Sequence, residues 1–422
     1  MLRSMFSAIS GLKAHQTKLD VAGNNIANVN TVGFKGSQTV FEDTLSQIIR
    51  NGSAPQGQTA GSNPAQVGLG VKVAGISTNW TQGSAQSTGR SSDFMITGDG
   101  FFITKSGNEN LYTRAGSFDT DGVGNLVTPD GLILQGWMAT LDGTIDPQGP
   151  LVPLRIPQGQ VLAPVATSGA QIQGNLSAGA TAAVAGPPPV PGTQVTSQIR
   201  MFDDLGNAHE MSVVMECTGT NTWSLTVQEA GQPPVVNALA LTFSGTAPTT
   251  GQLVTPAGST TFTPATAGYA SWGGAVTLDL GGLTQFGGAS TAAGKANENT
   301  GSALGTLESY SLSNDGTIVG LYSNGLRQPL GQLALATFVN PGGLSKAGNS
   351  SFRAGDNSGQ PVVGQAGTGG RGQLSAGSLE MSNVDLAEEF TGLIVAQRGF
   401  QANSRVITTS DEILQDLVQL KR

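Results

Sequence analysis

The feature that most constrains this chain is a change of hydrophobic period between its two ends and its middle. At the N-terminus, apolar and small residues recur at spacings of three and four, which predicts an amphipathic helix over about 3–28. Near the C-terminus, apolar residues recur every seven positions, which predicts a second helix over about 385–420. The segments between them alternate with the period of two that is typical of strands. These patterns predict the fold class α+β.

The middle of the chain consists of short alternating runs that are separated by turn dipeptides. Five of the runs read VKVAGISTNW, NLVTPDGLILQGW, MSVVMEC, WSLTVQEA and LALATFVN. The pairs DG, NG, GG and PG lie around them, and such pairs favour tight turns between antiparallel strands. The proline cluster 186–192 and the Gly, Ala and Thr-rich stretches 243–274 and 287–296 are expected to be exposed loops.

The order of these patterns predicts a multidomain protein, and 422 residues are enough for about two to four domains. We expect the terminal α-helices to pair as a coiled-coil-like segment, with two nested, mainly antiparallel β domains between them. The expected boundaries are 1–30 for the N-terminal helix, 31–70 for an extended connecting segment, 71–165 and 295–370 for the two parts of an inner β domain, 166–294 for an inserted outer β domain, and 371–422 for a connecting segment and the C-terminal helix.

Charge and hydropathy exclude several classes of partner. The net charge is −8 and the Lys and Arg residues are scattered singly, so no nucleic acid is expected to bind. No stretch approaches the ~20 apolar residues of a membrane helix, so no membrane insertion is expected. The start, MLRSMFSAISGLKAHQ, breaks its apolar run with Ser, Gly and Lys, so no cleaved signal peptide is expected. The single cysteine, Cys217, excludes an intramolecular disulfide and is expected to be a buried strand side chain.

The sequence contains no recognisable catalytic constellation. His15 and His209 lie in different expected elements, and nothing places a nucleophile, a base and an orienting acid together. Asp203 and Asp204 are adjacent, so in a strand they would face opposite ways, and DLGN indicates a turn. We therefore expect no catalytic residues, no cofactor and no enzymatic activity.

The stretch DTDGVGNLVTPD, residues 119–130, imitates a calcium-binding loop. Asp119, Asp121, Gly124 and Asp130 occupy loop positions 1, 3, 6 and 12. However, Val123 stands where an oxygen ligand belongs, and strands rather than helices are expected to flank the stretch. A hairpin turn made of Asp and Gly is the better interpretation, and no metal site is expected.

The two terminal helices would be marginal if they packed only against each other. Burying about a dozen side chains at ~1.5–3 kcal/mol each contributes on the order of 20–35 kcal/mol. Ordering ~60 residues costs on the order of 60–120 kcal/mol of backbone entropy, which helix hydrogen bonds offset only in part. The missing burial must come from another surface, either other copies of the chain or a β domain of the same monomer.

Several blocks of the sequence resemble one family of proteins. NNIANVNTVGFK (24–35) closely resembles a signature of the bacterial flagellar rod, hook and hook-associated axial proteins. The similarity extends to DFMITGDGFFIT (93–104), to YTRAGSFDTDGVGNLVTPDGLILQGW (112–137) and to SNVDLAEEFTGLIVAQRGFQANSRVITTSDEILQDLVQL (382–420). Within that group, the length of the chain and the blocks MFDDLGNAHEMSVV and GQLALATFVNPGGLSKAGNSSFRAGDNSGQP are similar to the flagellar hook proteins.

The resemblance implies a tubular homopolymer in which terminal helices form an inner tube and β domains lie outside it. Such a tube bends as a universal joint while it transmits torque from rod to filament. The implied partners are copies of the chain itself, the distal rod protein, the hook-filament junction protein, the hook cap and the flagellar type III export apparatus. The implied location is extracellular, in the hook of the bacterial flagellum, after export without a cleaved signal peptide.

The resemblance also implies that the inner helices carry the subunit interface. The expected interface residues are Met5, Ile9, Leu12, Leu19, Asn24, Asn25, Ile26, Asn28, Leu386, Phe390, Leu393, Phe400, Ile407 and Leu414. Asn at a helix end can satisfy orphan carbonyls and bridge to other backbones. One hypothesis is that the Asn cluster fixes the exit of the helix and docks against adjacent subunits; the alternative is an ordinary helix end with local caps.

Two other functions remain open. One is another axial protein, the distal rod protein or a hook-associated protein, which the hook-like middle blocks disfavour. The other is a glycan-binding or enzymatic outer β domain within 166–294. That segment contains few charged residues and offers few convergent polar groups.

Overall fold

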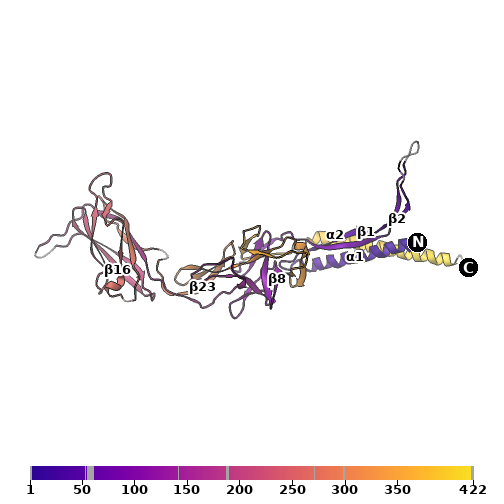
Figure 1. Ribbon diagram of the computed structural model, residues 1–422, viewed down its shortest axis with the longest axis horizontal. Helices are drawn as coiled ribbons and strands as arrows, with labels where there is room; N and C mark the ends of the chain where they lie inside the picture. The colour runs from indigo at the N-terminus through magenta and orange to yellow at the C-terminus, as the bar shows by residue number, and fades with distance from the viewer. Residues whose placement is uncertain are drawn as a thin grey trace. The chain divides into compact units, whose positions relative to one another are not determined.

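The computed structural model describes residues 2–52, 54, 61–140, 142–186, 190–269, 271–297 and 300–419. The chain forms two units: unit 1 is Met1–Ile156, Tyr310–Val319 and Pro329–Arg422, and unit 2 is Pro157–Ser309 and Gly320–Gln328. The structure is mostly β, with one long helix near each end of the chain, as the sequence predicts (Figure 1).

The two helices of unit 1 lie side by side (Figure 1). Helix α1 spans Leu2–Ala27 and α2 spans Leu386–Gln419, close to the predicted bounds. The Asp385 carboxylate caps the start of α2, because its Oδ1 accepts hydrogen bonds from the backbone N–H groups of Ala387 (2.8 Å) and Glu388 (3.3 Å). Lys421 and Arg422, whose charges suit the negative end of a helix dipole, lie outside the described residues.

A two-stranded antiparallel ribbon runs beside α1. It consists of β1 (Ser37–Asp43) and β4 (Val71–Thr78). The ring of Phe41 in β1 meets the ring of His15 edge to face at 5.7 Å, and the backbone N–H of Val71 donates to Ser10 Oγ at 3.3 Å. Between the two strands of the ribbon, the chain forms a second hairpin from β2 (Ser46–Arg50) and β3 (Ala65–Gly68). The expected connecting segment 31–70 thus contains the paired strands β1, β2 and β3.

The rest of unit 1 is built from short strands, with aromatic residues at its centre. Phe101, Tyr112, Phe338 and Phe352 are buried together, and Trp80 packs edge to face on Phe352 at 4.9 Å between ring centroids. Neighbouring strands follow the order β25-β11-β7-β8-β28-β27. The strands and the short 3-10 helix η2 are β5 (Ala85–Ser87), β6 (Phe94–Thr97), β7 (Phe101–Ser106), β8 (Glu109–Thr113), β9 (Asp119–Thr120), β10 (Leu126–Val127), β11 (Ile133–Met138), β12 (Val152–Pro153), β26 (Leu335–Thr337), η2 (Pro341–Gly343), β27 (Ser345–Gly348), β28 (Ser351–Arg353), β29 (Val362–Gly364), β30 (Gln373–Ala376) and β31 (Ser378–Glu380).

Three further strands each contain a boundary between the units. They are β23 (Gly305–Leu312), β24 (Thr317–Tyr322) and β25 (Arg327–Leu333).

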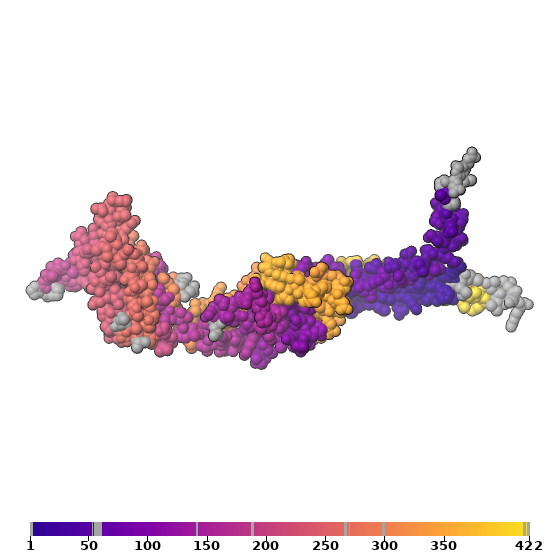
Figure 2. All heavy atoms as spheres, in the orientation of Figure 1, coloured from indigo at the N-terminus to yellow at the C-terminus, as the bar shows by residue number. Residues whose placement is uncertain are grey.

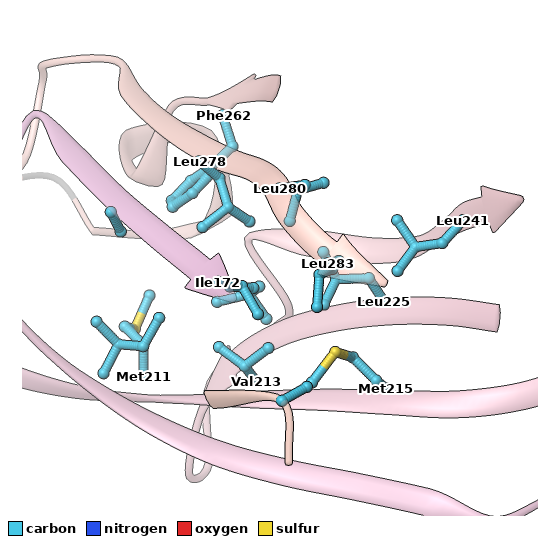
Figure 3. Close-up of a cluster of buried hydrophobic side chains, with 14 of the residues drawn as sticks. Ile172, Met211, Val213, Met215, Leu225, Leu241, Phe262, Leu278, Leu280 and Leu283 are labelled. Atoms are coloured by element: carbon cyan, nitrogen blue, oxygen red, sulfur yellow. The ribbon is translucent and has the colours of Figure 1, made fainter. Parts of the chain in front are cut away.

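Unit 2 contains two sheets, which share one apolar core (Figure 3). One sheet has the order β20-β21-β14-β22 and the other β15-β16-β17-β18-β19. Met211, Val213 and Met215 of β16 alternate inward, where they meet Ile172 of β14 and Leu280 of β21. The bounds are β13 (Val161–Leu162), β14 (Gly169–Ser177), β15 (Gln194–Phe202), β16 (Ala208–Gly219), β17 (Thr222–Glu229), β18 (Val236–Phe243), β19 (Leu253–Thr255), β20 (Ser259–Phe262), η1 (Pro264–Ala267), β21 (Val276–Phe286) and β22 (Ala293–Ala296).

Unit 2 differs from the sequence predictions in two ways. Strands β14 and β21 run parallel, an exception to the expected antiparallel pairing. The stretches 243–274 and 287–296 were expected to be exposed loops, but they hold β19, β20, η1 and β22, and they bury Phe262, Tyr269 and Trp272. That prediction was wrong because the Gly and Thr-rich composition hides single aromatic residues that supply the core. In the proline cluster, residues 187–189 lie outside the described part.

Candidate functional site

The two long helices pack antiparallel in one fixed register. The amide of Asn25 donates to Glu389 Oε1 at 2.7 Å, a Cβ added at Gly399 would lie 2.5 Å from His15 Nε2, and one added at Gly11 would lie 2.7 Å from Asn403 Nδ2. The two residue numbers in each of these contacts add to 414, so each step along α1 is matched by an equal step back along α2. The register therefore holds from one end of the pair to the other.

Small side chains fill the seam between the helices. Ala8, Ala14 and Ala22 of α1 are buried, and so are Ala396 and Ser410 of α2. Small residues allow two helix backbones to approach closely but bury little apolar area. The residues that meet or are buried between the helices are therefore mainly small or polar.

Several large apolar side chains of the helices are exposed. Phe6 is 63% exposed, Phe390 is 51% exposed and Ile394 is 56% exposed. Exposed large apolar residues on both helices are Phe6, Leu386, Phe390, Ile394, Val395, Val406 and Ile413. A soluble monomer rarely exposes such a cluster, so this surface is a candidate interface.

The expected interface residues fall into three classes of burial. Asn25 is buried, whereas Asn24, Leu386 and Phe390 are exposed. The half-buried ones are Met5, Ile9, Leu12, Leu19, Ile26, Asn28, Leu393, Phe400, Ile407 and Leu414. The half-buried residues keep part of their apolar surface available after the two helices have packed.

Asn25 joins three elements within one chain. Its amide donates to Ser37 O at 2.8 Å and to Glu389 Oε1 at 2.7 Å, and its Oδ1 accepts from the Ser37 N–H at 3.0 Å. Since its side chain is 1% exposed, these bonds fix the end of α1 to the start of β1 and the start of α2. Asn25 thus fixes the exit of α1 through bonds to distant parts of the same chain rather than as a local cap.

Asn28 closes the end of α1. Its amide donates to the Asn24 carbonyl at 2.9 Å, and its Oδ1 accepts from the hydroxyl of Thr31 at 3.1 Å. The Asn24 carbonyl also accepts from the Asn28 backbone N–H at 3.2 Å, so the side chain adds a second bond to the last turn of the helix. Asn24 and Asn28 remain at the surface, where a second molecule can reach them.

A buried ionic cluster lies just after the end of α1 in the chain. Lys35 Nζ lies 2.6 Å from Glu380 Oε1, and Arg114 Nη1 lies 3.4 Å from Glu380 Oε2. Lys35 also donates to the Thr81 carbonyl at 2.8 Å, and the Gly83 N–H donates to Glu380 Oε1 at 2.9 Å. These contacts tie the segment after α1 to the strand before α2 and to β-rich parts of unit 1.

Burial dominates the electrostatics of this cluster. Desolvation lowers the pKa of the Lys35 ammonium, although its hydrogen bond and charge interaction with Glu380 oppose that shift. Desolvation likewise lowers the pKa of the Arg114 guanidinium, again against the attraction of Glu380. A buried ion pair is favourable only when both partners are present. The helix junction, meaning the contact between the segment after α1 and the strand before α2, therefore depends on Glu380.

Gly33 is required by the backbone at the same junction. It has a φ of +67°, and a Cβ there would lie 2.5 Å from the backbone nitrogen of Ala115. Its N–H donates to the Glu380 carbonyl at 2.7 Å. In the motif TVGFK, Gly33 thus permits the close approach and Lys35 supplies the buried charge.

The β2–β3 hairpin adds a second uncovered apolar surface to unit 1. It projects from the rest of that unit (Figure 2). Ile48 and Ile49 are adjacent, so they point to opposite faces, and both are exposed. Leu45, Val67 and Leu69 are exposed as well. A two-stranded hairpin is marginally stable by itself in water.

Two turns have the same Asp-x-x-Gly-Asn bonding pattern. Asp121 accepts from the Asn125 N–H at 2.8 Å and from the Asn125 amide at 2.8 Å, and Asp203 accepts from Asn207 in the same way at 2.7 and 3.0 Å. The first turn joins β9 to β10, which confirms the predicted hairpin in place of a calcium loop. The second confirms the turn predicted at DLGN. Within the described residues, no cluster of three His, Cys, Asp or Glu side chains is suited to hold a metal ion.

Both histidines pack against neighbouring side chains. His209 Nδ1 lies 3.1 Å from Glu229 Oε2, and its ring stacks on Trp272. The hydroxyl of Ser271 donates to Asp203 at 2.7 Å rather than to His209, so these groups lack the nucleophile-to-base bond of a catalytic triad. Cys217 is buried in β16, as the sequence predicts.

Four family models match successive parts of the chain. Their descriptions are "Flagella basal body rod protein" over 5–35, "Flagellar hook protein FlgE/F/G D1 domain" over 95–175, "Flagellar basal body protein FlaE D2 domain" over 175–299, and "Flagellar basal body rod FlgEFG protein C-terminal" over 375–420. The first and last of these contain the two long helices.

A relative from Borreliella burgdorferi, "Flagellar hook protein FlgE", is 41% identical and covers 100% of both chains. The chain belongs to the flagellar hook protein family. A rod relative from Bacillus subtilis, "Flagellar basal-body rod protein FlgG", is 32% identical over 100% of both chains. The higher identity to a hook protein agrees with the hook-like middle blocks.

The fold of this hook-family chain is similar to a crystal structure of the Helicobacter pylori flagellar hook protein FlgE2. The TM-score is 0.51 at 14% identity, and the match covers 70% of this chain and 100% of the other. The similarity therefore supports the fold. Neither helix combines the length and the apolar content that spanning a lipid bilayer requires, within the part of the chain that the structure describes.

Sequence reasoning missed two sets of residues at the helix junction. Glu380 and Asn383 precede α2, and Asn383 accepts from the Gly36 N–H at 2.9 Å while its amide donates to the Asn79 carbonyl at 2.9 Å. Nothing in the sequence pairs them with a segment more than 300 positions away. The buried small residues of the helices, such as Ala8, Ala22 and Ala396, were also missed.

Proposed function

We propose that this chain is the structural subunit of the flagellar hook and polymerises into a tube whose inner layer is made of α1 and α2. One observation carries the proposal: small residues of the helices are buried within the chain, while Phe6, Phe390 and Ile394 are exposed. Burying each such side chain between copies contributes about 1.5–3 kcal/mol. The seven exposed residues on the helices therefore provide on the order of 10–20 kcal/mol of gross driving force.

In this proposal the two helices of each subunit pair as a coiled-coil-like segment, and the expected interface residues complete the contacts with neighbouring copies. The heptad row of Leu393, Phe400, Ile407 and Leu414 supports this, because each residue is half-buried in the single chain. The division of the chain into unit 1 and unit 2 supports the nested layout, with the segments near 166–294 as the outer domain. The β domains then lie outside the helical layer.

We also infer the mechanical role. A tube whose outer contacts are weak and can slide would bend while its inner helices keep continuity, and it would transmit torque from rod to filament as a universal joint. The low charge of the chain and its 61 glycines support individually weak outer contacts. In this role the chain is a structural protein rather than an enzyme.

The export route and the partners of the chain follow from the same proposed function. The chain would be exported through the flagellar type III apparatus without a cleaved signal peptide and would assemble outside the cell beneath the hook cap. Its polymer would join the distal rod protein at one end and the hook-filament junction protein at the other. Straight, rigid polymers from the purified chain would instead favour a rod protein.

The test replaces the exposed apolar residues of the helices in the full chain. The triple variant Phe6→Gln, Phe390→Gln and Ile394→Gln is expected to lose polymerisation, measured by sedimentation and electron microscopy, with unchanged thermal unfolding of unit 2. The control is Val123→Gln, at a turn residue that is 61% exposed, which should polymerise like the unmodified chain. Normal polymerisation of the triple variant would contradict the proposal.

A further inference from the structure

Helix α2 extends past the start of α1. In the register set by Asn25 and Glu389, by His15 and Gly399, and by Gly11 and Asn403, Leu2 lies opposite Glu412. Helix α2 continues to Gln419, so its last seven residues have no counterpart on α1 (Figure 1). At 1.5 Å per residue this overhang is about 10 Å long.

The overhang and the turn before it carry acidic residues. Asp411, Glu412 and Asp416 are exposed, and 411–419 contains no Lys or Arg. Glu412 and Asp416 are four residues apart and share one face of the helix. Carboxylates near a helix C-terminus face the negative end of its dipole, so a cation from elsewhere would stabilise them.

A pocket lies near the other end of the helix pair. It has a volume of about 440 Å³ and lies between the exit of α1 and the β27–β28 hairpin, lined by Asn24, Asn28, Thr31, Phe34 and Lys346 among others. This volume falls within the range of small binding pockets, so it admits one or two side chains. Its polar lining consists of amides, hydroxyls and ammonium groups.

Lys346 gives this pocket a positive charge with no carboxylate partner among the described residues. Its Nζ donates to Ser37 Oγ at 3.0 Å and lies 5.4 Å from the centre of the Phe34 ring. Burial lowers the pKa of its ammonium, whereas a nearby carboxylate would favour the charged form. The side chain as a whole remains accessible to a second molecule.

We propose that the acidic C-terminal end of α2 of one copy docks in this pocket of the next copy, with the carboxylates of Glu412 and Asp416 paired with Lys346. The inference rests on the proposed function, because it specifies one contact of the polymer. The two surfaces differ and lie near opposite ends of the helix pair, so the contact is head-to-tail. Such a contact does not close on itself in a dimer and extends into a filament or ring.

The test is a charge exchange in the full chain. Lys346→Glu, and separately the double variant Glu412→Lys and Asp416→Lys, are each expected to raise the concentration needed for polymerisation by about tenfold or more. The chain with all three changes should recover most of that loss. Arg327→Glu, an equal change of charge at an exposed position on β25, is the control and should have little effect.

The outcomes separate this inference from the proposed function. If the unmodified chain does not polymerise, the proposed function fails. If it polymerises and the double variant on the exposed overhang does so at an unchanged concentration, or the exchange restores nothing, the docking is wrong. An unchanged Lys346→Glu variant would also overturn it, with Lys421 and Arg422 then the alternative cations for these carboxylates. If Lys346→Glu lowers thermal stability, its effect on polymerisation can come from the fold. The polymerisation of the double variant Glu412→Lys and Asp416→Lys then tests the docking by itself.

Discussion

Unit 2 and the helix pair of unit 1 use apolar residues in opposite ways. In unit 2, Trp223, Leu225, Trp272 and Leu278 are at most 1% exposed and belong to one core. Figure 3 shows Leu225 and Leu278 in this core. In the helix pair, Ala396 is 0% exposed while Phe390 is half exposed. Unit 2 therefore buries its apolar residues internally, whereas the helices leave several of theirs exposed. This difference supports the proposal that unit 2 is stable by itself and that the helices mediate assembly.

The largest expected effect on folding is in the core of unit 2. Trp272→Ala should lower the free energy of unfolding of unit 2 by about 3–5 kcal/mol, because it leaves a large cavity between the sheets. Denaturant unfolding followed by near-ultraviolet circular dichroism measures the change. A loss below about 1 kcal/mol would show that the core of unit 2 is not close-packed, and would remove the contrast with the helices.

The second largest effect should be at the helix junction. Glu380→Gln removes the carboxylate that Lys35 and Arg114 both contact, and although Asp99 still attracts Arg114, this loss should destabilise unit 1 by about 3 kcal/mol. Glu109→Gln is the matched control, since Glu109 pairs with Arg353 at a half-exposed site and should cost at most about 1 kcal/mol. Thermal unfolding of both variants measures the difference, and equal losses would refute the role given to the buried cluster.

A smaller, pH-dependent effect is expected at Asp203. Burial alone would raise the pKa of this carboxyl, but hydrogen bonds from Ser271 and Asn207 hold it well below its usual value. A carboxyl whose pKa is lower in the folded state stabilises that state above about pH 4 and loses this contribution as the pH falls through the folded pKa.

Asp203→Asn should therefore lower the stability of unit 2 at pH 7 by about 1–3 kcal/mol and flatten its decline in acid. Unfolding curves between pH 7 and pH 2 test both parts. An undiminished acid dependence in this variant would assign the effect to other carboxylates. Asp204→Asn is a useful comparison, because the Asp204 carboxylate accepts a hydrogen bond from the Gly273 N–H at an exposed site.

The smallest effect on folding is expected at Phe390, a residue of the proposed assembly surface. Phe390→Ser removes a side chain that is half exposed, so the free energy of unfolding of the dilute chain should change by no more than about 0.5 kcal/mol. Chemical unfolding at low concentration measures it. A loss near 2 kcal/mol would mean that Phe390 packs within the monomer and would weaken the comparison.

The sequence predicted both helices, the main strands and the turns at 119–130 and 203–207, because their periods and turn residues are local properties. It did not predict β19, β20 and β22, whose core residues are single aromatics in Gly and Thr-rich segments. Nor could it show that Lys35, Arg114 and Glu380 meet, because they are far apart in the chain. Leu386 and Phe390 were recognised among the exposed apolar residues of the helices, but Phe6 and Ile394 were not, and neither were buried small residues such as Ala22 and Ala396.

The most direct test of the account is hydrogen exchange measured on the full chain, first dilute and then polymerised. We predict that amides of α1 and α2 exchange much faster than those of β16 in the dilute chain, and that polymerisation protects the helices while β16 changes little. If α1 and α2 are as protected as β16 in the dilute monomer, the helices do not depend on other copies, and the central claim is wrong.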